Sequence, residues 1–274
     1  MLSRITGKFL PCDGKISIVA MDHGMTGAVD GFKNPEVTLK KVLSGKPDGI
    51  LVSPNFARNF CYEFNANPHV RLIIRVDMMG TSTLAGVEGK EELQFCYVDV
   101  EQALNVRADA IMSLFIYGRE DKSVLLDNMK YLAALSEKSH RYNVPHIMEV
   151  PFWGKMCPVD DAGKAKLLEN ACRVAFELGA DMIKAPYLAN NRDAFVNITS
   201  NLPIPIIVLG GAKTDSEKDL LTMVKNALDD GARGVAIGRN VWQSKSPDKM
   251  CDAINQIIHK GISVTQGLEI LQDR

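Results

Sequence analysis

The sequence lacks cysteine pairs at metal-binding spacing, and this excludes the common structural zinc sites. Its six cysteines include no C-x-x-C pair and no neighbouring cluster of Cys and His, whereas structural zinc needs four such ligands close together. We therefore expect no bound metal and interpret the cysteines as reduced residues of the core. They are Cys12, Cys61, Cys96, Cys157, Cys172 and Cys251.

The chain also has no excess of charge of either sign. Its 32 Lys and Arg residues balance 33 Asp and Glu residues, so the formal net charge is -1. Binding to nucleic acid or to an anionic membrane surface depends on a basic field that this composition does not supply. We expect neither nucleic acid nor membranes as partners, and any anionic ligand must be bound by a local site.

Long apolar runs are absent as well. The opening residues MLSRITGKFLPCDGK contain no continuous apolar segment of the kind a signal peptide has, and no stretch approaches the roughly 20 apolar residues that span a bilayer. We expect a cytoplasmic location. What the sequence does have is an ordinary globular composition, with 46% hydrophobic and 24% charged residues, which is enough for a large core.

Eight short apolar runs, rich in β-branched residues and without alternation, recur along the 274 residues. Strands that are buried on both faces of a parallel sheet have this pattern. Because helical segments separate nearly all of the runs, we predict a single α/β domain over residues 1–274 that forms a (β/α)8 TIM barrel. A flavodoxin-like open sheet is the alternative. The runs cover residues 16–21, 49–53, 72–76, 110–116, 146–150, 181–185, 204–209 and 234–237.

Local signals place the helix ends between these runs. Predicted starts are Asn34 with Pro35, Thr214 with Glu217 as a capping box, and Ser246 with Pro247. Predicted stops are Gly45, Gly179 and Gly231. We expect an extra C-terminal helix at about 263–273. The segment 77–99 is too long for a plain βα loop, and we expect it to extend the active-site rim or to form an oligomer contact.

In such a barrel, catalytic groups stand at the C-terminal ends of the strands, and Lys184 ends the sixth run, in DMIKAPY. A cation in an apolar strand must either reach a partner or lose its charge. A neutral amine in a dry site is a nucleophile for carbonyl groups. The competing interpretation is a lysine that extends to the barrel rim and has no chemical role.

Carboxylates occupy two other strand ends. Asp22, followed by His23, comes directly after the first run, where it could orient a substrate hydroxyl or move a proton; otherwise it caps a turn. Glu149 lies at the end of the fifth run. We predict that it is a general acid and base whose pKa is raised by burial, or else an ion-pair partner of Lys184, Lys155 or Arg75.

Glycine pairs and a basic residue close the last two runs. Gly210, Gly211 and Lys213 follow the seventh run, and Gly238 and Arg239 follow the eighth. Either set alone could be a tight turn. Together they match the usual phosphate site of these barrels, because glycine lets backbone N–H groups approach an anion and arginine adds a bidentate charge.

The motifs VAMDHG, DMIKAPY, LGGAK and VAIGRNVWQS resemble the archaeal-type (DhnA-type) class I aldolase family, over about Ile16 to Lys260. That family includes fructose-bisphosphate aldolases, an aminodideoxyheptulosonate synthase and the LsrF-like thiolase that acts on phosphorylated autoinducer-2. The resemblance implies Lys184 as the Schiff-base lysine, Asp22 as a catalytic or orienting carboxylate, and His23 in the same pocket. It also implies a phosphate site at Gly210, Gly211, Lys213, Gly238 and Arg239, no cofactor, and a homo-oligomer, with a ring-based decamer as one form.

One departure from that family concerns proton transfer. Its fructose-bisphosphate aldolases carry a catalytic tyrosine just before a proline at strand five, where this chain has Val150 before Pro151. Glu149 is the nearest replacement and is similar to the strand-five glutamate of tagatose-bisphosphate and sulfofructose-phosphate aldolases. Tyr117 and Tyr187 could serve instead and are predicted to bind substrate.

The predicted function is a class I aldolase that cleaves or forms a carbon–carbon bond in a phosphorylated ketose. Arg75, a predicted substrate-binding residue, resembles an arginine of the LsrF-like thiolase, so acetyl transfer from a phosphorylated dione to coenzyme A is an alternative. A non-catalytic phosphosugar-binding barrel is the alternative from a different class, because the family tyrosine is missing.

Overall fold

The computed structural model describes residues 4–27, 29–79, 94–211, 213–214 and 216–272. Eight parallel strands close into a barrel in the order β1-β10-β9-β8-β7-β6-β3-β2. Seven of the eight predicted apolar runs contain one strand of the barrel, and the remaining run overlaps a strand that begins one residue earlier. The TIM-barrel prediction is therefore confirmed and the open sheet is excluded. The strands are β1 (Ile16–Ala20), β2 (Gly49–Val52), β3 (Arg71–Arg75), β6 (Ala110–Leu114), β7 (His146–Glu149), β8 (Met182–Ala185), β9 (Ile206–Leu209) and β10 (Gly234–Ile237).

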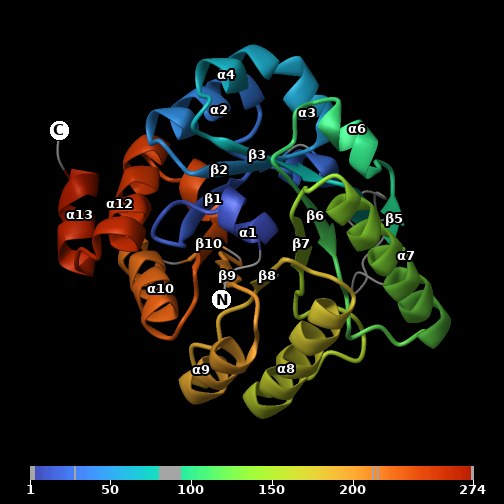
Figure 1. Ribbon diagram of the computed structural model, residues 1–274. Coiled ribbons are helices and arrows are strands. Elements are labelled where there is room, and N and C mark those ends of the chain that lie inside the picture. Colours follow the sequence, from blue (N-terminus) through green and yellow to red (C-terminus); the bar gives the residue numbers. More distant parts are fainter. Residues whose placement is uncertain (1–3, 28, 80–93, 212, 215, 273–274) are drawn as a thin grey trace.

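Helices surround the barrel, as Figure 1 shows. The long ones are α2 (Pro35–Ser44), α7 (Lys122–Arg141), α8 (Asp161–Glu177), α9 (Arg192–Asn201), α10 (Glu217–Asp229), α12 (Pro247–Lys260) and α13 (Val264–Gln272). The short ones are α1 (Arg4–Phe9), η1 (His23–Thr26), α3 (Pro54–Asn59), α4 (Cys61–Ala66), α6 (Val100–Leu104) and α11 (Arg239–Trp242). The C-terminal α13 packs on α12 and α10. Among the described helices, none is both long and apolar enough to cross a membrane.

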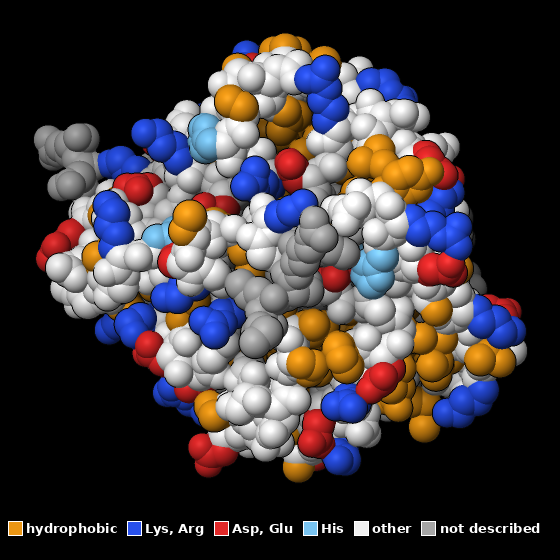
Figure 2. Space-filling model, viewed as in Figure 1, with side chains coloured by type: hydrophobic (Ala, Val, Ile, Leu, Met, Phe, Trp, Pro, Cys, Tyr) orange, Lys and Arg blue, Asp and Glu red, His pale blue; other side chains and the backbone are white. Residues whose placement is uncertain are grey.

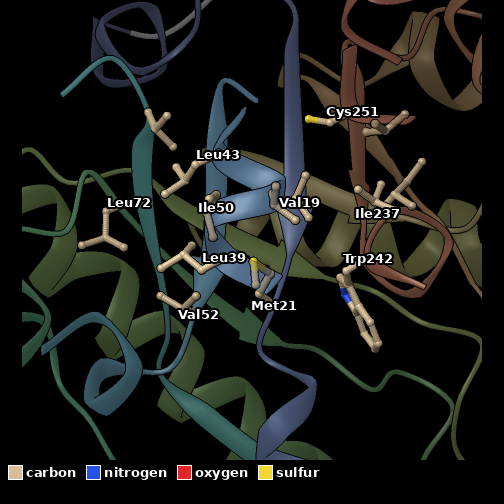
Figure 3. Packing of buried hydrophobic residues seen from close by; sticks show 14 of the residues in the cluster. Val19, Met21, Leu39, Leu43, Ile50, Val52, Leu72, Ile237, Trp242 and Cys251 are labelled. Atoms are coloured by element: carbon tan, nitrogen blue, oxygen red, sulfur yellow. The ribbon is translucent and has the colours of Figure 1, made fainter. Parts of the chain in front are cut away.

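The core has two layers because successive strand residues point to opposite faces. Ile16, Ile18 and Ala20 of β1 belong to the cluster inside the barrel, which Phe9 joins from the end of α1. Val19 belongs to the outer layer between strands and helices. Figure 3 shows part of that outer layer, where side chains from the strands meet side chains from α2. On the face drawn in Figure 2, charged side chains of both signs are interspersed.

Two helix-start predictions agree with the structure and one is wrong. Asn34 caps α2 and Pro35 follows it, while Pro247 begins α12 after Ser246. The predicted box of Thr214 and Glu217 does not form, because the N-cap of α10 is Ser216, which accepts a hydrogen bond from the Asp219 N–H. The Thr214 N–H and hydroxyl instead donate to Asn240 Oδ1, at 2.8 and 3.1 Å. This bond holds Thr214 outside the helix.

The interpretation of the cysteines is wrong in part. All six are free thiols, as expected, but only Cys172 and Cys251 are buried. Cys12, Cys61 and Cys96 are exposed, since they lie in a loop, on a helix without buried residues, and in an edge strand.

A histidine and two aspartates connect α12 to the lower end of the barrel, by which we mean the end at which the strands begin. His259 bonds through Nδ1 to Asp13 Oδ2 at 2.7 Å and through Nε2 to Asp48 Oδ2 at 2.8 Å. Asp48 Oδ2 also accepts the Ser17 N–H of β1, at 2.6 Å. The hydrogen bond to Asp48 raises the pKa of His259 to about 9 against the opposing effect of burial. The chain is therefore closed at the end opposite to the strand C-termini by an ionic contact.

The segment 77–99 contains a small antiparallel ribbon. Its strands are β4 (Asp77–Met79) and β5 (Gln94–Cys96). Residues 80–93 lie outside the described residues, so the expectation of a rim or an oligomer contact there stays a prediction.

Candidate active site

A cavity of about 440 Å³ lies at the C-terminal ends of the barrel strands, where the sequence predicts the catalytic groups. Its volume is within the range of small-molecule sites. Nine of the twelve predicted site residues line it: Asp22, His23, Arg75, Glu149, Lys184, Gly210, Gly211, Gly238 and Arg239. The remaining three are Tyr117, Tyr187 and Lys213.

Lys184 and Glu149 form the centre of the cavity. They are register partners on the adjacent strands β8 and β7, so their side chains leave the sheet on the same face. Lys184 Nζ lies 2.8 Å from Glu149 Oε1, and the two residues are only 5% and 7% exposed. The lysine therefore does not extend to the solvent at the rim, and of the predicted partners of Glu149 it is Lys184 and Arg75 that pair with it.

Arg75 connects the carboxylates that surround the lysine. Its Nε donates to Asp22 Oδ2 at 2.8 Å, and its Nη2 donates to Glu149 Oε2. Its Nη1 lies 3.7 Å from Asp77 Oδ1. Arg75 lines the cavity as predicted, but its charge is shared among three protein carboxylates. Its geometry is that of a residue which positions Asp22 and Glu149.

Both carboxylates nearest to the lysine are ionised at neutral pH. Burial opposes the ionisation of Asp22, but the charges of Arg75, His23 and Lys184 outweigh it and lower the pKa of Asp22 to about 2. Burial likewise opposes the ionisation of Glu149, yet Lys184 and Arg75 bring the pKa of Glu149 below its usual value. The prediction of a raised pKa for Glu149 is wrong, because it considered burial without the two cations.

Asp77 is a cavity residue that was not among the predicted site residues. It is fully buried, and burial raises its pKa to about 6 although Arg75 acts against this. Its Oδ2 accepts the Leu114 N–H at 2.7 Å and Gln94 Nε2 at 2.6 Å. Within the described residues its Oδ1 receives no hydrogen bond. Asp77 is two residues after Arg75, and residues at this spacing point to the same face of an extended chain. This spacing is the sequence signal that could have identified Asp77.

His23 lies against Trp242 at the mouth of β1. The two rings meet edge to face with centroids 5.3 Å apart, and His23 Nδ1 is 3.5 Å from Asp22 Oδ1. Burial lowers the pKa of His23, which favours the neutral imidazole. A Cβ on Gly238 would come within 2.6 Å of the His23 ring, so glycine at this position is what allows the histidine into the cavity.

The loops after β9 and β10 meet at the other side of the lysine. Gly211 has φ +61, a left-handed conformation that favours glycine, and its carbonyl accepts Arg239 Nη2 at 2.9 Å. Asn240 Nδ2 donates to the Gly210 carbonyl at 3.2 Å. Arg239 Nε is buried and has no acceptor among the described residues. The two predicted anion loops thus form one structure, in which the Arg239 Nε–H is available to a bound anion. We call it the anion end of the cavity.

The structure does not bring the last three predicted residues into the cavity. Lys213 is exposed and donates to the Gln243 carbonyl at 3.4 Å. Tyr117 packs edge to face on Phe115 in the outer layer. Tyr187 donates its hydroxyl to Asp230 Oδ2 at 2.6 Å. This geometry does not support a role for the two tyrosines in substrate binding or proton transfer, since packing outside the barrel directs both away from Lys184.

The family model of the DeoC/LacD aldolases matches residues 16–244. The chain belongs to this aldolase family. The match covers most of the barrel and agrees with the resemblance that the strand-end motifs indicate. An uncharacterized aldolase of Saccharolobus solfataricus is 30% identical over 260 residues, which are 94% of this chain and 95% of the relative.

A relative with a named activity is a 2-amino-4,5-dihydroxy-6-oxo-7-(phosphonooxy)heptanoate synthase of Streptomyces griseus. It is 30% identical over 247 residues, which are 89% of this chain and 85% of the synthase. Among solved structures, an archaeal fructose 1,6-bisphosphate aldolase superposes with a TM-score of 0.79 at 24% identity, covering 94% of this chain and 98% of that one. At this identity the superposition supports the barrel fold and nothing finer. Membership in this aldolase family supports an enzyme and not a non-catalytic phosphosugar-binding barrel.

Proposed function

We propose that this aldolase uses Lys184 to form a Schiff base with the ketone carbon of a phosphorylated ketose. One observation carries the proposal: a buried lysine, hydrogen-bonded at 2.8 Å to the buried Glu149, lies in a cavity whose wall also includes the glycine loops and Arg239. An amine held in this way can meet a carbonyl carbon while the phosphate is bound a short distance away.

The first step needs a neutral amine. The ammonium proton of Lys184 passes to Glu149 Oε1, and the amine attacks the ketone carbon to give a carbinolamine. Loss of the carbinol oxygen as water, with the proton on Glu149 assisting, leaves a protonated imine. Glu149 can accept the proton because the strongest of the charges that lower its pKa is that of Lys184, and this charge disappears as the proton moves.

The second step breaks the carbon–carbon bond. A base removes the proton of the β-hydroxyl, that oxygen becomes the carbonyl of the leaving aldehyde, and the electron pair of the broken bond moves to the imine nitrogen. Protonation of the resulting enamine and hydrolysis of the imine by water then release the ketone and restore Lys184. The pKa of about 2 makes Asp22 a weak base, so we assign the proton transfers to Glu149 and the orientation of substrate hydroxyls to Asp22.

The phosphate of the substrate is assigned to the anion end. Glycines at Gly210, Gly211 and Gly238 let backbone come close to an anion, and Arg239 Nε has no protein acceptor among the described residues. The product named for the Streptomyces griseus synthase carries a ketone beside a phosphorylated carbon and a hydroxyl two carbons away from that ketone. The same arrangement would place the phosphate, the ketone and the β-hydroxyl in order along the cavity of this chain.

The decisive experiment is reductive trapping. The protein is incubated with dihydroxyacetone phosphate and borohydride, and the modified peptide is identified by mass spectrometry. We expect one adduct, on the peptide that contains Lys184, and none in Lys184→Ala. Lys213→Ala is the matched control, because that lysine is exposed and outside the cavity. No adduct, or an adduct that persists in Lys184→Ala, would overturn the proposal.

Acetyl transfer to coenzyme A receives no support from the site. That alternative rests on the missing family tyrosine and on Arg75, whose guanidinium is engaged by Asp22, Glu149 and Asp77. Product analysis in the presence of coenzyme A would reveal it as acetyl-coenzyme A. The homo-oligomer stays a prediction, which light scattering on the purified protein would test.

A further inference from the structure

The cavity has two chemically different ends, and this bears on the substrate of the proposed aldolase reaction. In the barrel order, β9 and β10 lie across the ring from β3 and β6. The anion end therefore faces the side chains that follow those opposite strands and the neighbouring β7. Besides Pro151, four apolar side chains at the ends of these strands or just after them line the cavity: Met78, Leu114, Phe152 and Trp153. We call these four residues the apolar wall.

Each cation among the described cavity residues has protein carboxylates as partners or belongs to the anion end. Among the described residues that line the cavity, the lysine and arginine residues are Lys184, Arg75 and Arg239. Lys184 and Arg75 are paired with buried carboxylates, and Arg239 is part of the anion end. Lys155, two residues after Trp153, does not line the cavity and pairs with Glu120 at 3.1 Å.

The wall is also held in place. Gly154 follows Trp153 with φ +94, and a Cβ there would come within 2.2 Å of the Gly118 carbonyl oxygen. That carbonyl accepts the Met156 N–H at 2.9 Å. The loop after β7 is thus packed directly against the loop after β6, and these contacts hold the backbone that follows Phe152 and Trp153.

We propose that the substrate carries a single phosphate and that the aldehyde fragment on the far side of the cleaved bond is uncharged and partly apolar. This inference rests on the proposed function. A second phosphate at the apolar wall would lose its hydration, and the described cavity cation nearest to the wall in the sequence, Arg75, is already paired with three carboxylates, so this loss is unfavourable. An alkyl or aryl group at the same place would remove apolar surface from water and stabilise the complex in proportion to the area covered.

Two unreactive ligands test this inference without any covalent step. Butyl phosphate has one phosphate and an apolar tail, whereas the bisphosphate of butane-1,4-diol has a phosphate at each end of the same chain. We expect calorimetry to show butyl phosphate binding at least about tenfold more tightly, the scale on which apolar pockets discriminate. Equal or tighter binding of the bisphosphate, or no binding of either ligand, overturns the inference. Because Lys184 does not react with these ligands, trapping of dihydroxyacetone phosphate can still succeed when this test fails.

A charge placed in the wall should reverse the preference. In Phe152→Arg, the bisphosphate is expected to gain about tenfold in affinity relative to butyl phosphate. Met156→Arg adds the same charge to the same loop at an exposed position outside the cavity and should leave the ratio of the two affinities unchanged. If Phe152→Arg does not fold, the relative affinities of butyl phosphate and the bisphosphate for the wild-type protein still test the inference.

Discussion

Replacing Asp77 with asparagine should stabilise this protein at neutral pH, although Asp77 is a fully buried member of the cavity wall. Asparagine has nearly the same shape, and its carbonyl oxygen can accept the bonds from the Leu114 N–H and Gln94 Nε2 that Asp77 Oδ2 accepts now. The substitution therefore removes a charge and retains the hydrogen bonds. It tests whether that charge is costly where it stands.

The expected magnitude follows from the pKa. Burial raises the pKa of Asp77 from 3.8 to about 6, and a shift of that size corresponds to about 3 kcal/mol at roughly 1.4 kcal/mol per pKa unit. Since the folded state binds the proton more tightly, the free energy of unfolding falls as pH rises from about 4 to 6. That shift already includes the attraction of Arg75. The amide group of asparagine would stand where Asp77 Oδ1 now lies, 3.7 Å from Arg75 Nη1, so we expect a smaller net gain of about 1 to 2 kcal/mol at pH 8.

Urea unfolding of both proteins at pH 4.5, 6 and 8 measures this effect. The asparagine variant should be as stable as the wild type or less stable at pH 4.5, where Asp77 is protonated, and more stable at pH 8. The two unfolding curves should keep the same denaturant dependence, since the fold does not change. The reasoning is refuted if the difference in the free energy of unfolding is independent of pH, or if the variant loses stability between pH 4.5 and 8 relative to the wild type.

Three further substitutions test the site and the lower end of the barrel. Glu149→Gln should lower kcat by about 100- to 10,000-fold, and retention of full kcat in steady-state assays would exclude Glu149 from the proton transfers. Arg239→Ala should raise the KM of a phosphorylated substrate by about tenfold to a hundredfold, the effect of one hydrogen bond to a charged group, and an unchanged KM would place the phosphate elsewhere. His259→Gln should lower the free energy of unfolding by about 1 to 2 kcal/mol at pH 6, after allowance for partial exposure. Because the pKa of His259 is raised to about 9, its contribution to the free energy of unfolding is complete below about pH 6.5 and is lost as pH rises through 9. Urea unfolding at pH 10 should therefore show little difference between the variant and the wild type. An equal loss of stability at pH 6 and pH 10 would contradict the ionic role.

The barrel could be predicted from the sequence because its strands are buried on both faces, which leaves apolar runs without alternation. The observed strands fall within the predicted runs except β3, which begins one residue earlier, at Arg71. The start of α10 does not follow from the sequence alone, since Thr214 and Ser216 both carry hydroxyls that can cap a helix. A tertiary contact from Asn240 decides between them.

The ends of the strands predict which residues lie near the site, but they do not predict where each side chain points. Residues such as Lys184 and Gly238 follow from the rule that catalytic groups stand at the C-terminal face. The alternation of side chains stops where a strand stops, so the directions of Tyr117 and Tyr187 depend on packing that the sequence does not specify. The pairing of Lys184 with Glu149 likewise depends on the register of β7 and β8.

The charges around Lys184 explain why an arginine is buried beside it. With Lys184 as an ammonium, two cations face the ionised Asp22 and Glu149. When the proton of Lys184 passes to Glu149, one charge of each sign disappears together, and Arg75 remains beside Asp22 and Asp77. A cavity without Arg75 would leave Asp22 ionised and unpaired at that moment, which burial makes costly. Under the proposed mechanism, Arg75 therefore allows Glu149 to carry protons while Asp22 stays charged and orients the substrate.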